Sequence, residues 1–147
     1  KLANDARLAT LVQRQLAARG VQAQDLDHLA RACALFKDRC STTIELADWL
    51  QMYFVPVHPA EADVAAHVPP AAVPAIRALR DQFTTLDWTK DAIAAALKAA
   101  LAAHALKMPQ LAPALRVLVC GRAQTPSIDA VLALFTRQQV LERLSRV

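Results

Sequence analysis

The segment from residue 106 to 128 constrains the fold most, because it combines a helical pattern with a defined end and a second helix start. Four apolar residues recur at i, i+4, i+7 and i+8, the spacing at which a helix buries one face: Leu111, Leu115, Leu118 and Val119. Arg116 falls off this stripe, so its guanidinium can reach solvent or a ligand. Gly121 is expected to end the helix, since glycine adopts the left-handed cap conformation without a steric penalty.

The next residues, Thr125 and Pro126, are typical of a helix start, with threonine as the N-cap and proline at the first helical position. Arg116 and Arg122 flank this start. The combination predicts a place for an anion or for the polar edge of a ring. Taken singly, each residue has an ordinary structural explanation as a cap or a surface arginine. Only their order and spacing together favour a binding function.

The rest of the chain shows the same helical periodicity. It is 55% hydrophobic and has two glycines among 147 residues, a composition that favours helices over a sheet. We therefore predict an all-α fold of eight or nine helices with no sheet. The expected N-caps are Asn4 or Asp5, Asp25, Thr42 with Glu45 in a capping box, Asp87 or Thr89, and Thr136 with Gln139 in a second box.

Pro56 and Pro59 interrupt the helical pattern, because proline lacks the N–H group that a helix needs. We place a boundary here and predict two consecutive helical subdomains, 1–55 and 56–147. Trp49 and Tyr53, one turn apart before the break, are expected to pack in a core rather than to stack on bases.

The net charge of +4 is concentrated at one end of the chain. Residues 1–106 are neutral, whereas residues 107–147 carry six basic and two acidic side chains. A concentrated basic region favours phosphate through counterion release. A solvated basic helix face explains the charge alone equally well.

Several classes of function find no support. No apolar run approaches the roughly 18 residues of a membrane helix. Cys33, Cys40 and Cys120 are odd in number and lack C-x-x-C spacing, so we expect reduced thiols, and a zinc site with His28 is disfavoured against core packing. No glycine-rich phosphate loop or catalytic cluster is present, so we predict no catalytic residue, metal or cofactor in this chain. The chain begins at Lys1 rather than methionine, and we expect it to be a piece of a longer protein.

A set of short motifs resembles the anticodon-binding region of bacterial glutamyl-tRNA synthetases. In order these are Lys107-Met108, Ala114-Leu115-Arg116-Val117, Gly121-Arg122, Thr125-Pro126-Ser127-Ile128 and the closing helix from Leu134 to Leu144. Three departures affect the expected loop geometry of residues 107–113. They are Pro109 where glycine is usual, Ala114 in place of the proline before Leu-Arg, and Val119-Cys120 in place of Leu-Thr. The match is more specific over 86–147 than over 1–85.

This resemblance implies a function in tRNA recognition. A parent glutamate–tRNA ligase would use ATP and Mg²⁺ in a preceding catalytic domain, and this segment would bind the splayed anticodon bases. The resemblance implies anticodon contacts at Arg116, Thr125, Pro126, Ile128 and, in the first subdomain, Arg39. It also makes plausible phosphate contacts at Lys107, Arg122 and Arg137, which position the RNA without reading its sequence. The expected partner is the tRNA for glutamate, and neither DNA nor a membrane is expected as a partner. The protein is expected to be a cytoplasmic monomer. Whether the parent also charges glutamine tRNA is left open by the sequence.

Two alternatives from other classes remain. One is a helical protein-interaction or regulatory module that holds a partner helix in an apolar groove, for which the alanine-rich segment 92–105 is suited. The other is a DNA-binding helix-turn-helix over 109–135, disfavoured by the length of the loop 121–124.

Overall fold

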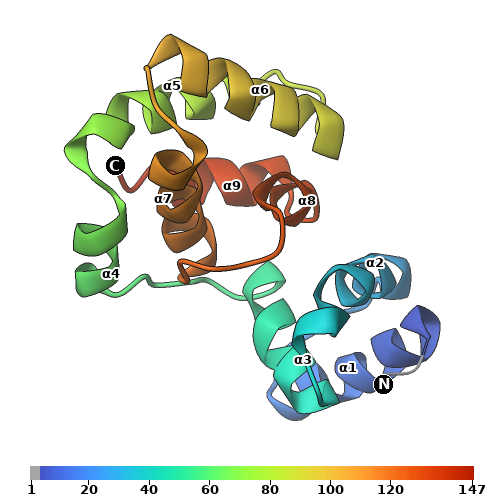
Figure 1. The fold of residues 1–147 in the computed structure, drawn as a ribbon. Coiled ribbons are helices and arrows are strands. Elements are labelled where there is room, and N and C mark those ends of the chain that lie inside the picture. Colours follow the sequence, from blue (N-terminus) through green and yellow to red (C-terminus); the bar gives the residue numbers. More distant parts are fainter. Residues whose placement is uncertain (1–3) are drawn as a thin grey trace. The chain divides into compact units, whose positions relative to one another are not determined.

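The fold is all-α, as predicted (Figure 1). A computed structural model describes residues 4–147, and these contain nine α-helices, three short 3-10 segments and no strand. The chain divides into two compact units, the first ending at Pro56 and the second spanning Val57–Val147.

Unit 1 is a three-helix unit in which α1 packs against both α2 and α3. Its elements are α1 (Asp5–Ala18), α2 (Leu26–Phe36), η1 (Lys37–Arg39), α3 (Thr43–Leu50) and η2 (Gln51–Tyr53). Each helix begins at a predicted N-cap: the side chains of Asn4, Asp25 and Thr42 accept backbone N–H groups of the first turn. The Glu45 carboxylate accepts from the N–H of Ser41 at 3.4 Å instead of that of Thr42, so this half of the predicted capping box is wrong.

Aromatic rings pack together in unit 1, where Tyr53 is buried in the core as predicted and Trp49 is half-buried at its edge. The ring centroid of Phe36, which is fully buried, lies 5.4 Å from that of Trp49 and 6.3 Å from that of Tyr53. Tyr53 also meets the imidazole of His28 edge-on at 5.7 Å. Such pairs add to the free energy gained from burial, because ring edges and faces carry opposite partial charges.

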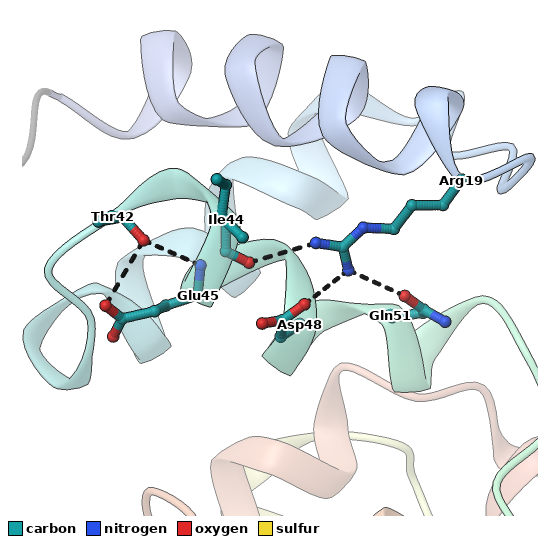
Figure 2. Close-up of polar contacts among 6 residues, drawn as sticks. All are labelled: Arg19, Thr42, Ile44, Glu45, Asp48 and Gln51. Carbon is teal, nitrogen blue, oxygen red and sulfur yellow. Dashed lines mark hydrogen bonds and ion pairs between the residues drawn. The ribbon is translucent and has the colours of Figure 1, made fainter.

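Arg19 fastens the end of α1 to α3 (Figure 2). Its Nη1 lies 2.8 Å from a carboxylate oxygen of Asp48 and donates to Oε1 of Gln51 at 3.1 Å, while Nη2 donates to the carbonyl of Ile44 at 3.5 Å. The side chains of Arg19 and Asp48 are 27% and 53% exposed, so water screens this ion pair and its contribution to stability is small.

Unit 2 is built around α7. Its elements are α4 (Glu61–His67), η3 (Pro70–Ala72), α5 (Val73–Phe83), α6 (Lys90–Ala103), α7 (Met108–Cys120), α8 (Ile128–Ala133) and α9 (Arg137–Leu144). Helix α7 packs against α4, α5, α8 and α9, and Figure 1 shows it among these helices. From Leu111 onward it is buried almost all the way round, including Ala114 and Val117 off the predicted stripe. The predicted single buried face is therefore too narrow, because helices cover α7 on several sides.

Trp88 anchors the connection between α5 and α6 to the end of α8. Its indole N–H donates to the carbonyl of Phe135 at 2.8 Å, and its ring meets Phe83 edge-on at 5.3 Å. The cap of α6 is Thr89, one of the two predicted residues, and the Thr136 and Gln139 capping box at the start of α9 is also confirmed.

Candidate nucleic-acid interface

The end of α7 and the start of α8 form the centre of the predicted site. Gly121 ends α7 in the left-handed conformation at φ 74°, as expected. Helix α8 begins at Ile128 with Ser127 as its N-cap, two residues beyond the predicted start, so the assignment of Thr125 as N-cap is wrong. The reason is that the Thr125 hydroxyl is engaged elsewhere: it donates to the carbonyl of Pro126 at 2.8 Å.

Thr125 also holds Arg116. The Nε of Arg116 donates to the Thr125 hydroxyl oxygen at 3.0 Å, across nine positions of the chain. Thr125 is only 4% exposed, and Arg116 is half-buried. A buried hydroxyl that accepts from Nε fixes the plane of the guanidinium, while the Nη groups are the donors that suit bidentate contacts with a ligand.

Arg116 lines a pocket of about 510 Å³ in unit 2. The first half of α7, the α7–α8 connection, the start of α8 and the end of α4 contribute its lining: His67, Met108, Pro109, Ala112, Pro113, Arg116, Ala123, Gln124, Ser127 and Ile128. The lining is mostly apolar with a few polar groups, which is typical of sites that bind small molecules or single bases.

The structure brings some of the predicted residues together at this pocket. Arg116 and Ile128 line it; Thr125 and Pro126 are buried and are not among the lining residues. The local sequence pattern gave no indication of His67, which comes from a separate helix. Gln124 could have been found from its position beside the Thr-Pro motif.

The remaining predicted residues lie in different settings. Lys107, the N-cap of α7, and Arg122, beyond its end, are both exposed. Arg137 is half-buried and donates to the carbonyl of Thr84 at 3.1 Å and to that of Leu86, after the end of α5. Arg39 is exposed at the end of η1 in unit 1. Phosphate contact at Arg137 would therefore compete with hydrogen bonds that hold the protein together.

Two further arginines cap the C-terminal end of α7. Arg143 is 7% exposed, donates to the carbonyl of Val119 at 2.8 Å, and lies over the ring of Phe135 at 4.7 Å. Arg146 donates to the carbonyl of Leu118 at 2.8 Å and to that of Val57. The last carbonyls of a helix lack donors within the helix and carry partial negative charge, so cations are favoured there. A carbonyl partner leaves the formal charge of the guanidinium in place, and the region stays basic.

The thiol at the end of α7 is not a nucleophile. Burial raises the pKa of Cys120 to about 12, although the nearby charges of Arg143, Arg116 and Arg122 act in the opposite direction. A thiol with this pKa keeps its proton at neutral pH and is unreactive. Cys33, Cys40 and Cys120 are all free thiols. Across residues 4–147, no group of three or more histidine, cysteine or acidic side chains is placed to hold a metal ion, and none of the described helices has the length and apolar character to span a bilayer.

The fold and the pocket define an all-helical binding domain. The chain belongs to the anticodon binding domain family, whose sequence model matches residues 7–147. The resemblance found in the sequence motifs is thereby confirmed.

Bacterial glutamate–tRNA ligases are similar in sequence to this chain. The chain is 55% identical over 148 residues to the enzyme of Leptothrix cholodnii, covering 100% of this chain and 32% of that protein. It is 52% identical over 149 residues to that of Verminephrobacter eiseniae, covering 97% and 31%. The chain thus spans about a third of the length of these relatives.

Solved structures have the same fold. A glutamate tRNA ligase from Elizabethkingia meningosepticum, crystallised in complex with its amino acid, superposes with a TM-score of 0.87 at 16% identity, over 98% of this chain and 29% of that one. The glutamate–tRNA synthetase of Elizabethkingia anophelis gives 0.82 at 17% identity, over 99% and 28%.

Proposed function

We propose that unit 2 binds an unstacked anticodon base in the α4–α7–α8 pocket, and that the chain reads the anticodon of the tRNA for glutamate. The observation that carries this proposal is the position of Arg116, which lines an otherwise mostly apolar pocket while buried Thr125 fixes its Nε. Single-stranded bases are recognised by hydrogen bonds to their edges and by stacking on their faces, and this lining offers groups for both.

The roles of individual residues follow from their settings. Arg116 binds the edge of the base, and Ile128 contacts its face. Thr125 and Pro126 act from beneath, as the support that orients Arg116. The exposed Lys107 and Arg122 attract the phosphate backbone, and Arg39, exposed on unit 1, contacts another part of the anticodon loop.

The parent protein is proposed to be a complete glutamate–tRNA ligase. It would attach glutamate to its tRNA with ATP and Mg²⁺ bound in a catalytic domain outside this chain, as a cytoplasmic monomer in protein synthesis. The names and lengths of the relatives support this proposal.

The protein-interaction module is not favoured, since the family match covers residues 7–147 and points to RNA. The helix-turn-helix is also disfavoured. The connection between α7 and α8 runs from Gly121 to Ser127, longer than the about three to four residues of that motif, and α8 has only 6 residues.

The test measures the affinity of the chain for glutamate tRNA and for variants of this tRNA in which each anticodon base is replaced in turn. Each affinity is measured at about 50 and 200 mM salt. We expect one or more replacements to weaken binding by about tenfold or more. Arg116→Ala should reduce affinity for the native anticodon by a similar factor and remove the preference at the base it contacts. This corresponds to about 1–3 kcal/mol for a base-edge contact.

The matched control is Arg77→Ala, which removes an exposed arginine of α5 that does not line the pocket. It should leave the anticodon preference intact. Binding that follows salt but ignores the anticodon, both in this chain and in the full-length ligase, would contradict the proposal and leave only a basic helical surface.

A further inference from the structure

His67 is the one lining residue that comes from outside the α7–α8 region. It is the last residue of α4, a helix that packs against α7, and it is half-buried. The sequence pattern assigned it no role. The family motifs around Arg116 lie some 50 positions away along the chain.

Its setting differs from that of a structural histidine. The ring of His28 in unit 1 stands edge-on to Tyr53 at 5.7 Å and to Phe54 at 5.9 Å. The imidazole of His67, by contrast, makes no hydrogen bond, ion pair or ring contact with any residue between 4 and 147. Its ring nitrogens are not among the fully buried polar atoms, so they are open to solvent or to a ligand. An accessible planar ring on a pocket wall can hold a flat ligand.

The rest of the lining indicates the shape and chemistry of that ligand. Pro109, Pro113 and Ile128 present apolar surface, whereas Arg116 and Gln124 present hydrogen-bonding groups. A flat molecule with apolar faces and polar edges satisfies both. In RNA recognition, unstacked bases are held in this way, against histidine, aromatic or arginine planes.

We infer that the imidazole of His67 stacks on the anticodon base whose edge Arg116 binds. This inference rests on the proposed function of the pocket and adds a residue to it. Arg116 determines which edge is accepted, and His67 compensates for the stacking energy that the base loses when it leaves its neighbours. Stacking tolerates every base, so His67 contributes to affinity more than to discrimination.

The test uses glutamate tRNA with 2-aminopurine at each anticodon position in turn, because stacking quenches the fluorescence of this base. His67→Ala and His67→Gln remove the ring, and His67→Phe keeps a ring without the nitrogens. The control is His104→Ala, a half-buried histidine at the end of α6 that does not line the pocket. Circular dichroism verifies that each variant is folded.

We expect the wild-type chain to quench one labelled position. His67→Ala and His67→Gln should weaken binding about tenfold and lose that quenching. His67→Phe should keep affinity within about threefold of wild type and keep the quenching, and His104→Ala should behave as wild type.

Two results would overturn the inference while leaving the proposed function in place. One is wild-type affinity and quenching in His67→Ala, with anticodon preference preserved. The other is an equal loss in His67→Phe and His67→Ala, which would exclude stacking. A wild-type chain without any anticodon preference would instead defeat the proposed function and this inference together.

Discussion

The last backbone carbonyls of α1 and of α7 obtain their hydrogen-bond donors in different ways. Both end at a glycine with positive φ, 77° at Gly20 and 74° at Gly121. At the end of α1, neighbouring residues satisfy the free carbonyls: the N–H of Gly20 donates to Ala17 and that of Val21 to Leu16. At the end of α7, Arg143 of α9 and Arg146, just beyond α9, donate to the carbonyls of Val119 and Leu118.

The surroundings of the two glycines differ accordingly. Apart from its chain neighbours, no atom of residues 4–147 lies within 4 Å of the position that a Cβ on Gly20 would occupy, whereas a Cβ on Gly121 would lie 2.7 Å from a side-chain carbon of Val57. The carbonyls at the end of α1 are satisfied by neighbouring residues, and the Arg19 side chain reaches a distant helix. The end of α7 is a tertiary structure in which distant segments converge, and it adjoins the segment that holds Arg116.

The largest difference is expected from alanine at the two glycines. Gly121→Ala should lower the free energy of unfolding by about 3 kcal/mol, because it combines a left-handed backbone with a contact that forces Val57 to move. Gly20→Ala should lower it by only about 1 kcal/mol, since the backbone penalty acts alone. Urea unfolding followed by circular dichroism measures both. Equal losses would show that packing at Gly121 adds nothing.

A smaller difference is expected between the two arginines that secure these ends. Arg143→Met keeps the apolar stem but leaves the carbonyl of the buried Val119 without this donor, and should destabilise by about 2 kcal/mol. Arg19→Met removes a partly exposed ion pair with Asp48 and should destabilise by about 0.5 kcal/mol. The same urea titrations decide between them. A larger effect at Arg19 would show that the end of α7 depends less on its arginine than the end of α1 does.

Thiol labelling of the native cysteines perturbs the protein least, and it monitors the two units separately. Cys40 is half-buried and should react with a thiol reagent at pH 8 in the folded chain. Burial raises the pKa of both Cys33 and Cys120 to about 12, so each keeps its proton until its own unit opens. Cys33 therefore reports on unit 1 and Cys120 on unit 2.

Combined with the glycine variants, this labelling sharpens the comparison. Gly121→Ala should speed the labelling of Cys120 and leave that of Cys33 unchanged, and mass spectrometry of the labelled peptides distinguishes them. Rapid labelling of Cys120 in the wild-type chain would be inconsistent with a buried end of α7.

Much of the helical framework could be predicted because its signals are local. Asn4, Asp25, Thr89 and Thr136 cap helices as expected, since a side-chain oxygen one turn before a free N–H needs no distant partner. The local rule failed at Thr125. Its hydroxyl accepts from Arg116 and donates to the Pro126 carbonyl instead of capping the next helix.

The candidate site was predicted only in part for the same reason. Arg116 and Ile128 belong to neighbouring motifs, and the pocket unites them; His67 joins them only because α4 packs on α7. The basic charge of the C-terminal segment was evident from composition. The sequence did not show which of these basic side chains bind the protein itself. Arg137, Arg143 and Arg146 donate to backbone carbonyls, whereas Lys107 and Arg122 are exposed.

The sequence by itself determined that this chain is helical, where most of its helices begin, and which family its motifs resemble. These properties depend on contacts within a turn or two, or on the order of residues along the chain. The tertiary structure alone decided which arginines donate to backbone carbonyls and which one lines the pocket. It also brought His67 to the same pocket as Arg116. Partners separated by tens of residues meet only after packing, so no local pattern encodes their contact.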